Sequence, residues 1–312
     1  MSDISTIKEI QWDGNTITKP GVYSGISLHD YHHKTDLFDG PSISKSTLKH
    51  IFPAHGGSPK AFWGRWSHNP HHVEHKKSKE LDFGKAVHCL LLADEVFSEH
   101  FVVRPDHWKD WRTDASRAWR DDVEADGKTI VTAEQIERIK LIANDAAEYP
   151  LVKLGLLNGA VERTIVYKDR ETGIWVRTRP DVKPLDGIFS DLKTASRFDE
   201  DFLERQLFDN FYYGQAAMTR MACAALNIPF ETFALLFVLN DDVPDTTHVE
   251  ISPFDIDRGE RAIRWALKTI RQCLDTGDWH GARPFNGGER HLKMKPWSAE
   301  RLDLFLDMEE AS

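Results

Sequence analysis

Apolar residues recur at helical spacing through the first half of this chain, as far as Pro150. The segment Ser42–Phe52 places Ser44 in an N-cap position, and apolar residues follow at helical spacing. Thr132–Gln135 has the capping-box pattern and opens a second apolar stripe. These patterns predict helices over 42–52, from residue 59 onward, over 81–92 and over 133–149.

The second half of the chain changes to the period of a strand. Short runs with strand-like patterns are separated by Asp169–Gly173, which suits a hairpin connection because Gly173 tolerates a positive φ. A later apolar run is continuous, as expected for a strand buried on both faces. The predicted elements are strands 161–167, 174–179 and 188–193, mainly one long helix 199–226, strands 230–239 and 247–251, and a helix 257–274.

Helices followed by an antiparallel meander, a helix and a strand define an α/β protein with a mixed central sheet flanked by helices. This order resembles the restriction-endonuclease-like αβββαβ core with an enlarged helical N-terminal part. We expect one main domain over residues 41–297. An irregular lead-in over 1–40 precedes it, and a short helix and tail over 298–312 follow.

Composition places the chain among soluble globular proteins, with 312 residues, 40% hydrophobic and 29% charged. No apolar run approaches the roughly 20 residues of a membrane span, and Met1–Ile4 lacks the pattern of a secretory signal. Three cysteines without a C-x-x-C pair argue against disulfides and against zinc or iron–sulfur sites. We therefore expect a cytoplasmic protein with no membrane partner.

The formal net charge of −10 argues against a protein that coats nucleic acid by bulk attraction. It does not exclude an enzyme whose acidic site binds metal. Any contact with DNA would then depend on a local basic patch.

The candidate chemistry lies in Asp181 and in Asp191-Leu192-Lys193. Two carboxylates on neighbouring strands are oxygen ligands of the kind that hard divalent cations prefer. The period of a strand puts Asp191 and Lys193 on one face and turns Leu192 into the core. Two surface turns with ordinary charges are the alternative interpretation of these short motifs.

Histidines supply two further candidates. His88 lies on the apolar helix 81–92, one turn after Gly84, where it is either a core residue or a metal ligand. The segment 67–79 contains four histidines, including His71 and His75 at i and i+4. We interpret it as a mobile, solvated loop, because no apolar framework would hold metal ligands there.

Several sequence motifs together resemble those of the RecB-type PD-(D/E)xK nucleases. Within that group the resemblance is to the RecE (exonuclease VIII) C-terminal family with its phage relatives. The likeness runs from about Gly21 to Trp297. Its motifs are Ser42-x-Ser44-x-x-x-Leu48, Pro59-x-x-Phe62, Phe83–His88, Arg179-Pro180-Asp181, Asp191–Ala195 and Leu292–Trp297.

This resemblance implies roles for individual residues. His88, Asp181 and Asp191 would bind metal together with the backbone carbonyl of Leu192. Lys193 would orient or help to deprotonate the attacking water.

Two further positions are weaker. Gln215 would contact the DNA backbone or the water, although it could be an ordinary helix-surface amide. Thr219 stands where the family pattern expects Tyr, which puts that role in doubt. Glu162 is a weaker metal ligand or outer-sphere residue, or simply an exposed strand residue.

The resemblance implies a Mg²⁺-dependent exodeoxyribonuclease, with Mn²⁺ as a substitute and no iron–sulfur cluster. It would degrade linear duplex DNA 5′→3′ in the bacterial host cytoplasm, leaving 3′ single strands for a RecT-like annealing protein. A ring of three or four copies would surround the DNA, lined by Arg177, Arg179, Lys183 and Arg197. The rivals are a structure-specific or single-strand nuclease on the same core and a catalytically silent DNA-binding relative.

Overall fold

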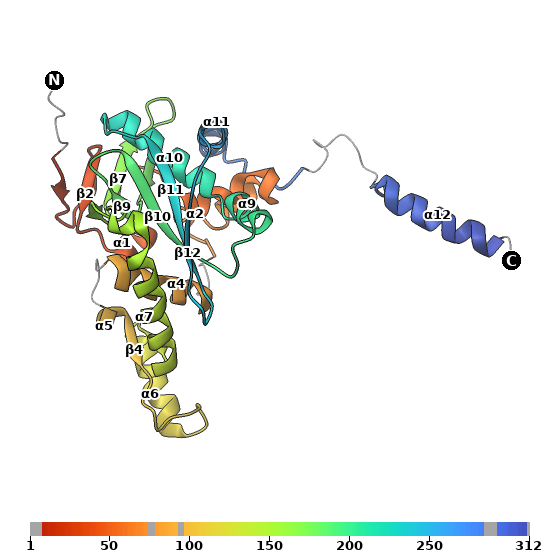
Figure 1. Cartoon of the computed structure of the whole chain (residues 1–312). Coiled ribbons are helices and arrows are strands. Elements are labelled where there is room, and N and C mark those ends of the chain that lie inside the picture. The colour runs from red at the N-terminus through yellow and green to blue at the C-terminus, as the bar shows by residue number, and fades with distance from the viewer. Residues whose placement is uncertain (1–7, 74–78, 93–96, 284–291, 311–312) are drawn as a thin grey trace.

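The computed structural model describes residues 8–73, 79–92, 97–283 and 292–310. Mixed sheets with helices on both sides form the body of the protein (Figure 1), which confirms the α/β fold expected from the order of elements. No helix in these ranges combines the length and apolar composition needed to cross a membrane.

The main sheet has five strands and contains the longest apolar runs of the chain. Its central pair, β10 and β11, is parallel over eight residues, and the other pairs are antiparallel. In spatial order the strands are β12 (Thr246–Glu250), β11 (Thr232–Leu239), β10 (Ile188–Ala195), β9 (Val182–Lys183) and β6 (Ala160–Val161).

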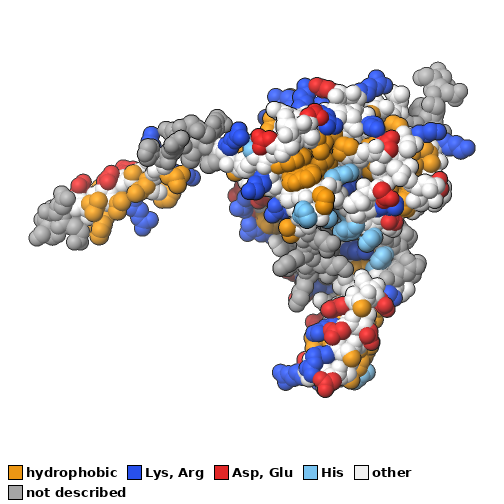
Figure 2. All heavy atoms as spheres, turned by 180° about the vertical axis from the view of Figure 1, so that it is seen from behind, with side chains coloured by type: hydrophobic (Ala, Val, Ile, Leu, Met, Phe, Trp, Pro, Cys, Tyr) orange, Lys and Arg blue, Asp and Glu red, His pale blue; other side chains and the backbone are white. Residues whose placement is uncertain are grey.

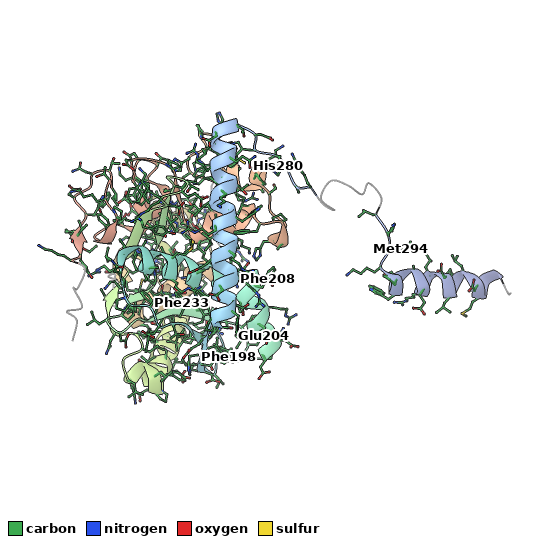
Figure 3. All side chains as sticks on the ribbon, turned by 90° about the horizontal axis from the view of Figure 1, so that it is seen from above. Phe198, Glu204, Phe208, Phe233, His280 and Met294 are labelled. Carbon is green, nitrogen blue, oxygen red and sulfur yellow. The ribbon has the colours of Figure 1, made fainter. Side chains whose placement is uncertain are left out.

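Alternation along β10 divides the core into two layers. Phe189 packs with α10 (Tyr212–Leu226) and α11 (Pro253–Thr276), whereas Leu192 packs on the opposite face with α4 (Lys79–Leu92) and α7 (Ala133–Glu148). Figure 3 shows α11 running across the top of the core. Helices on both faces explain why β11 is apolar at nearly every position.

A second five-stranded sheet adjoins α10. The expected lead-in contributes to it, because β2 pairs with β7. Its order is β1 (Ile10–Gln11), β2 (Gly21–Ser24), β7 (Thr164–Lys168), β8 (Trp175–Thr178) and β3 (Ser42–Ile43), and a separate pair joins β4 (Phe101–Val103) to β5 (Thr129–Val131).

Short helices complete the body, and the last helix is exposed. Figure 2 shows apolar side chains along one side of α12 (Pro296–Glu310) and acidic ones along the other. The remaining helices are α1 (Leu28–His33), α2 (Lys45–Leu48), η1 (Lys49–Ile51), η2 (Pro53–His55), α3 (Pro59–Trp63), α5 (Phe97–His100), α6 (Asp114–Ala125), α8 (Pro150–Lys153) and α9 (Glu200–Asp209).

Two predicted elements are broken by residues with left-handed backbone. The expected strand 161–167 divides at Glu162 (φ 55°), so that β6 joins the main sheet and β7 the second one. The expected meander is therefore wrong, since β8 and β10 lie in different sheets. The expected helix 199–226 divides at Phe211 (φ 56°) into α9 and α10.

The described part of the histidine-rich segment, residues 67–73, includes one histidine that packs against the body of the protein. Nε2 of His68 accepts a hydrogen bond from the Ser42 N–H at 3.1 Å, and its ring lies 4.7 Å from that of Trp66. Burial, with a smaller contribution from Arg177, lowers the pKa of His68 to about 4. His71 is exposed and His75 lies outside the described residues, so the interpretation of the whole segment as a mobile, solvated loop remains a prediction.

Gly214 leaves room for the ring of Phe211, and we predict that Gly214→Ala destabilises the fold. A Cβ on Gly214 would lie 2.2 Å from that ring. Overpacking of this kind costs about 1–3 kcal/mol, which exceeds the gain of roughly 1 kcal/mol in helix propensity. Thermal unfolding should show a lower midpoint than wild type. Gly40→Ala, which adds a Cβ in open space, is the control and should unfold like wild type.

We predict that His68 makes the fold sensitive to acid. Its pKa is about 4 in the folded chain against an ordinary 6.5, so protonation favours the unfolded state. The stability present above pH 6.5 should fall by about 1–3 kcal/mol as the pH drops toward 4. Urea unfolding at several pH values should show a weaker pH dependence for His68→Gln than for wild type. The same weakening in His71→Gln would contradict the assignment.

Candidate active site

Three carboxylate residues form a row across neighbouring strands of the main sheet. Val182 of β9 pairs with β6 on one side and β10 on the other. Asp181 precedes Val182, so the same register places it opposite Glu162 on one side and Asp191 on the other. The Glu162 N–H donates to the Asp181 carbonyl at 2.9 Å, in agreement with this register.

His88 approaches this row from α4. Its Nδ1 lies 3.6 Å from Oδ2 of Asp181, and its Nε2 lies 3.0 Å from the carbonyl oxygen of Leu192. When Nε2 carries the proton and donates it to that carbonyl, Nδ1 presents a lone pair toward the carboxylates. Ligand atoms of His88, Glu162 and Asp181 all lie within 4.8 Å of one another.

The peptide groups of Leu192 connect the site residues. Its N–H donates to Oδ2 of Asp181 at 2.6 Å. Its carbonyl lies within hydrogen-bond distance of His88 and accepts from Nζ of Lys193 at 3.1 Å. Those two contacts use both lone pairs of the carbonyl, so its role as a metal ligand remains a prediction.

Asp191 is buried on the face of β10 that lies toward α10. One oxygen accepts from Nε2 of Gln215 at 2.7 Å, and the other accepts from Nζ of Lys193. Burial lowers the pKa of Lys193, while Asp181 and Glu162 act in the opposite direction. Oε1 of Gln215 is buried and has no hydrogen-bond partner in the described ranges. Gln215 therefore holds Asp191 and has a vacant acceptor.

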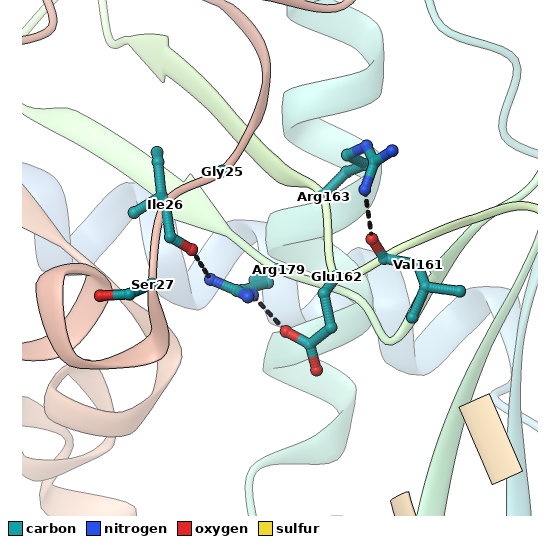
Figure 4. Close-up of a pocket in the computed structure, with 7 residues that line it drawn as sticks. All are labelled: Gly25, Ile26, Ser27, Val161, Glu162, Arg163 and Arg179. Atoms are coloured by element: carbon teal, nitrogen blue, oxygen red, sulfur yellow. Dashed lines mark hydrogen bonds and ion pairs between the residues drawn. The ribbon is translucent and has the colours of Figure 1, made fainter. Parts of the chain in front are cut away.

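Glu162 is held against the row at some conformational cost. A left-handed backbone in a residue other than glycine is sparsely populated. Its carboxylate accepts from Nε of Arg179, whose Nη1 donates to the carbonyl of Ile26 at 2.7 Å (Figure 4). Arg179 and Glu162 line an open pocket of about 300 Å³ together with Ser27 and its neighbours.

The residue in place of the expected Tyr has a structural role. Thr219 is fully buried, and its hydroxyl lies 2.9 Å from that of Thr178 and donates to the carbonyl of Gln215 at 3.0 Å. This contact ties α10 to β8. A tyrosine ring would not fit in the same space.

The four basic residues expected to line a DNA channel differ in exposure. Arg177 is 4% exposed and packs on the rings of Tyr31 and Phe38, where DNA cannot reach it directly. Arg179 forms an ion pair with Glu162, and Lys183 is half-buried. Only Arg197 among these four is largely exposed, although it pairs with Asp199.

Two side chains near the site carry no signal that pattern analysis would recognise. Lys45 follows the Ser42-x-Ser44 phrase, and Tyr212 opens α10 directly after the left-handed Phe211. Both approach Lys193 only because α2 and α10 pack against the end of β10.

The donor set at this site fits a hard divalent cation. An imidazole nitrogen of His88 and the oxygens of Glu162 and Asp181 converge, and Asp191 lies beside them, bonded to Gln215. Carboxylate oxygens are the ligands that Mg²⁺ and Mn²⁺ prefer. The three cysteines are all buried, and none belongs to the converging group.

Comparisons with known proteins bear on the fold and the family of this chain. The crystal structure of a "Putative exonuclease" from Eubacterium rectale superposes with a TM-score of 0.56 at 12% identity, covering 88% of this chain and 96% of the other. At that identity the likeness shows a shared fold. A search of curated proteins finds no match.

Residues 44–282 match the model of a protein family described as a PDDEXK-like domain of unknown function (DUF3799). This match spans about three quarters of the chain and contains His88, Glu162, Asp181, Asp191, Lys193 and Gln215. The protein therefore belongs to the PDDEXK-like DUF3799 family.

Proposed function

We propose that this protein is a metal-dependent deoxyribonuclease that degrades linear duplex DNA from its ends. The observation that carries the proposal is the convergence of His88, Glu162 and Asp181 beside Lys193. A scaffold protein would have no use for buried carboxylates and an ammonium in this arrangement. The PDDEXK-like family and the fold shared with a protein described as an exonuclease support the same conclusion.

The residues divide the work of phosphodiester hydrolysis. His88, Glu162, Asp181 and Asp191 would hold one or two Mg²⁺ or Mn²⁺ ions. A bound divalent ion lowers the pKa of coordinated water and stabilises charge on the phosphate. Lys193, anchored to Asp191 and the Leu192 carbonyl, orients the attacking water and assists its deprotonation.

Gln215 keeps Asp191 in place while its vacant Oε1 is available to accept a hydrogen bond from the water. Because burial lowers the pKa of Lys193, its ammonium releases a proton more readily than an exposed lysine. Once it has released that proton, the side chain can accept one from the water.

The finer features of the proposal rest on the resemblance to RecE-type nucleases. They are 5′→3′ polarity, production of 3′ single strands for a RecT-like annealing partner, and assembly into a ring of three or four copies in the bacterial cytoplasm. The net charge of −10 supports a ring, because a closed channel needs only a few basic residues to retain DNA. Arg197 has the exposure needed for such a contact.

We predict that linear duplex DNA is degraded with Mg²⁺ and that closed circles are not. Lys193→Met and Asp191→Asn should each reduce the rate about 10²–10⁴-fold, as expected when a positioned acid–base group is lost. Lys168→Met, which removes a half-exposed cation of β7, is the matched control. Cleavage of closed circles would contradict the exonuclease proposal, and unchanged activity of both variants would contradict the site.

We also predict that divalent ions stabilise the folded protein. Binding at 100 times the dissociation constant contributes about 2.7 kcal/mol, so Mg²⁺ or Mn²⁺ added after EDTA treatment should raise the thermal unfolding midpoint. Asp181→Asn should lose most of this increase because it removes a converging oxygen. Asp201→Asn, on the exposed side of α9, should keep it. A full metal response in Asp181→Asn would rule out binding at this group.

A further inference from the structure

Lys45 is a second lysine close to the candidate active site, over the same aromatic ring as Lys193. It is the first residue of α2, directly after the N-cap Ser44. Its side chain is half-buried, and no carboxylate or carbonyl in the described part of the chain pairs with its ammonium. Its Nζ is not among the buried side-chain atoms that lack a partner, so the ammonium remains accessible and is available to an anionic ligand.

The surroundings of Lys45 show where that ligand would lie. Burial, followed by repulsion from Lys193, holds the pKa of Lys45 well below 10.5, and attraction to Asp181 opposes both. The ammonium of Lys45 thus shares an electrostatic environment with a residue of the metal-binding row and with the lysine beside the attacking water.

One aromatic ring positions both ammonium groups. Nζ of Lys45 lies 4.7 Å and Nζ of Lys193 lies 5.4 Å from the centroid of the Tyr212 ring. Burial raises the pKa of Tyr212 to about 12, so its hydroxyl stays neutral and the ring attracts the cations through its π-face. Tyr212 therefore offsets part of the repulsion between two ammonium groups held near one another.

The charge at the site explains the use of a second ammonium. Three carboxylates (Asp181, Asp191 and Glu162) face three cations (Lys45, Lys193 and Arg179). Before metal binds, the charges balance. A phosphodiester carries one negative charge and gains another as water attacks, so preformed positive charge stabilises the transition state. Lys193 and Arg179 already contact carboxylates, whereas Lys45 does not.

We propose that Lys45 binds a non-bridging oxygen of the scissile phosphate and acts as a second catalytic cation beside Lys193. This inference rests on the proposed nuclease function. In hydrolysis the water oxygen bonds to phosphorus and gives up a proton, and the phosphorus–oxygen bond to one nucleoside breaks. The leaving oxygen takes up a proton. Lys45 neither gains nor loses a proton in this sequence and contributes only charge and a hydrogen bond.

The test compares Lys45→Met, which removes the charge and leaves an unbranched side chain one atom shorter, with Lys45→Arg and with Lys49→Met. Lys49 lies one turn further along and donates to the carbonyl of Asp209, so it is the matched control. We expect the single-turnover rate to fall about 10²-fold in Lys45→Met, to recover in part in Lys45→Arg, and to stay at the wild-type value in Lys49→Met.

A second measurement does not depend on cleavage. Affinity for a short DNA duplex is measured by fluorescence anisotropy with Ca²⁺ in place of Mg²⁺, over a range of salt concentrations. Loss of one phosphate contact lowers the slope of log affinity against log salt by about 1. Lys45→Met should show this decrease, and Lys49→Met and Lys45→Arg should not. A purely structural role for Lys45 would leave the slope unchanged.

The outcomes separate this inference from the proposed function. Cleavage by Lys45→Met within threefold of wild type, with an unchanged salt slope, would overturn the role of Lys45 and leave the nuclease proposal intact. If wild type cleaves no DNA, the nuclease proposal fails, and an unchanged slope would then overturn the phosphate contact as well. If Lys45→Met does not fold, Lys45→Gln replaces it in both measurements.

Discussion

The candidate site depends on one peptide unit, that of Leu192, and on the register that holds it. Its N–H is bonded to Asp181, and its carbonyl lies within bonding distance of His88 and Lys193. Leu192 itself is fully buried between α4 and β11. A slip of one residue along β10 would exchange its two faces and would bury Lys193 in the apolar layer. The parallel pairing of β10 with β11 over eight residues prevents that slip.

Elements from both sides of the sheet meet at this peptide. His88 comes from the layer of α4 and α7, whereas Gln215 comes from α10 in the opposite layer. The two carboxylates of the motif are thereby held by different partners, Asp181 by the Leu192 N–H and Asp191 by Gln215. Lys193 links them, because it bonds both Asp191 and the Leu192 carbonyl. A divalent ion bound between the carboxylates would use groups that the apolar core already holds in place.

Two of the three non-glycine residues with left-handed backbone in the described ranges adjoin the candidate site, and the third, Asn227, ends α10. Glu162 adopts a left-handed backbone that ends β6 and starts the path to β7. Its carboxylate is restrained by Arg179, and its N–H is paired with Asp181. The left-handed Phe211 likewise precedes Tyr212, which then faces Lys45 and Lys193. Both departures from regular structure thus orient residues toward the same site.

The sequence by itself determined the α/β class, most helices, the buried strands β10 and β11, and the position of Asp191 and Lys193 on one face of β10. These features follow from local periodicity, because the two faces of a strand or helix must meet different surroundings. Only the tertiary structure decided that β7 and β8 leave the main sheet, that the helix after β10 is divided, and that Thr219 ties α10 to β8. The proximity of Lys45 and Tyr212 to Lys193 was equally invisible, since Lys45 lies 148 residues from Lys193 in the sequence and Tyr212 belongs to a separate helix. Such proximity depends on how whole layers of helices and strands fit together, and the periodicity of one segment does not report on that fit.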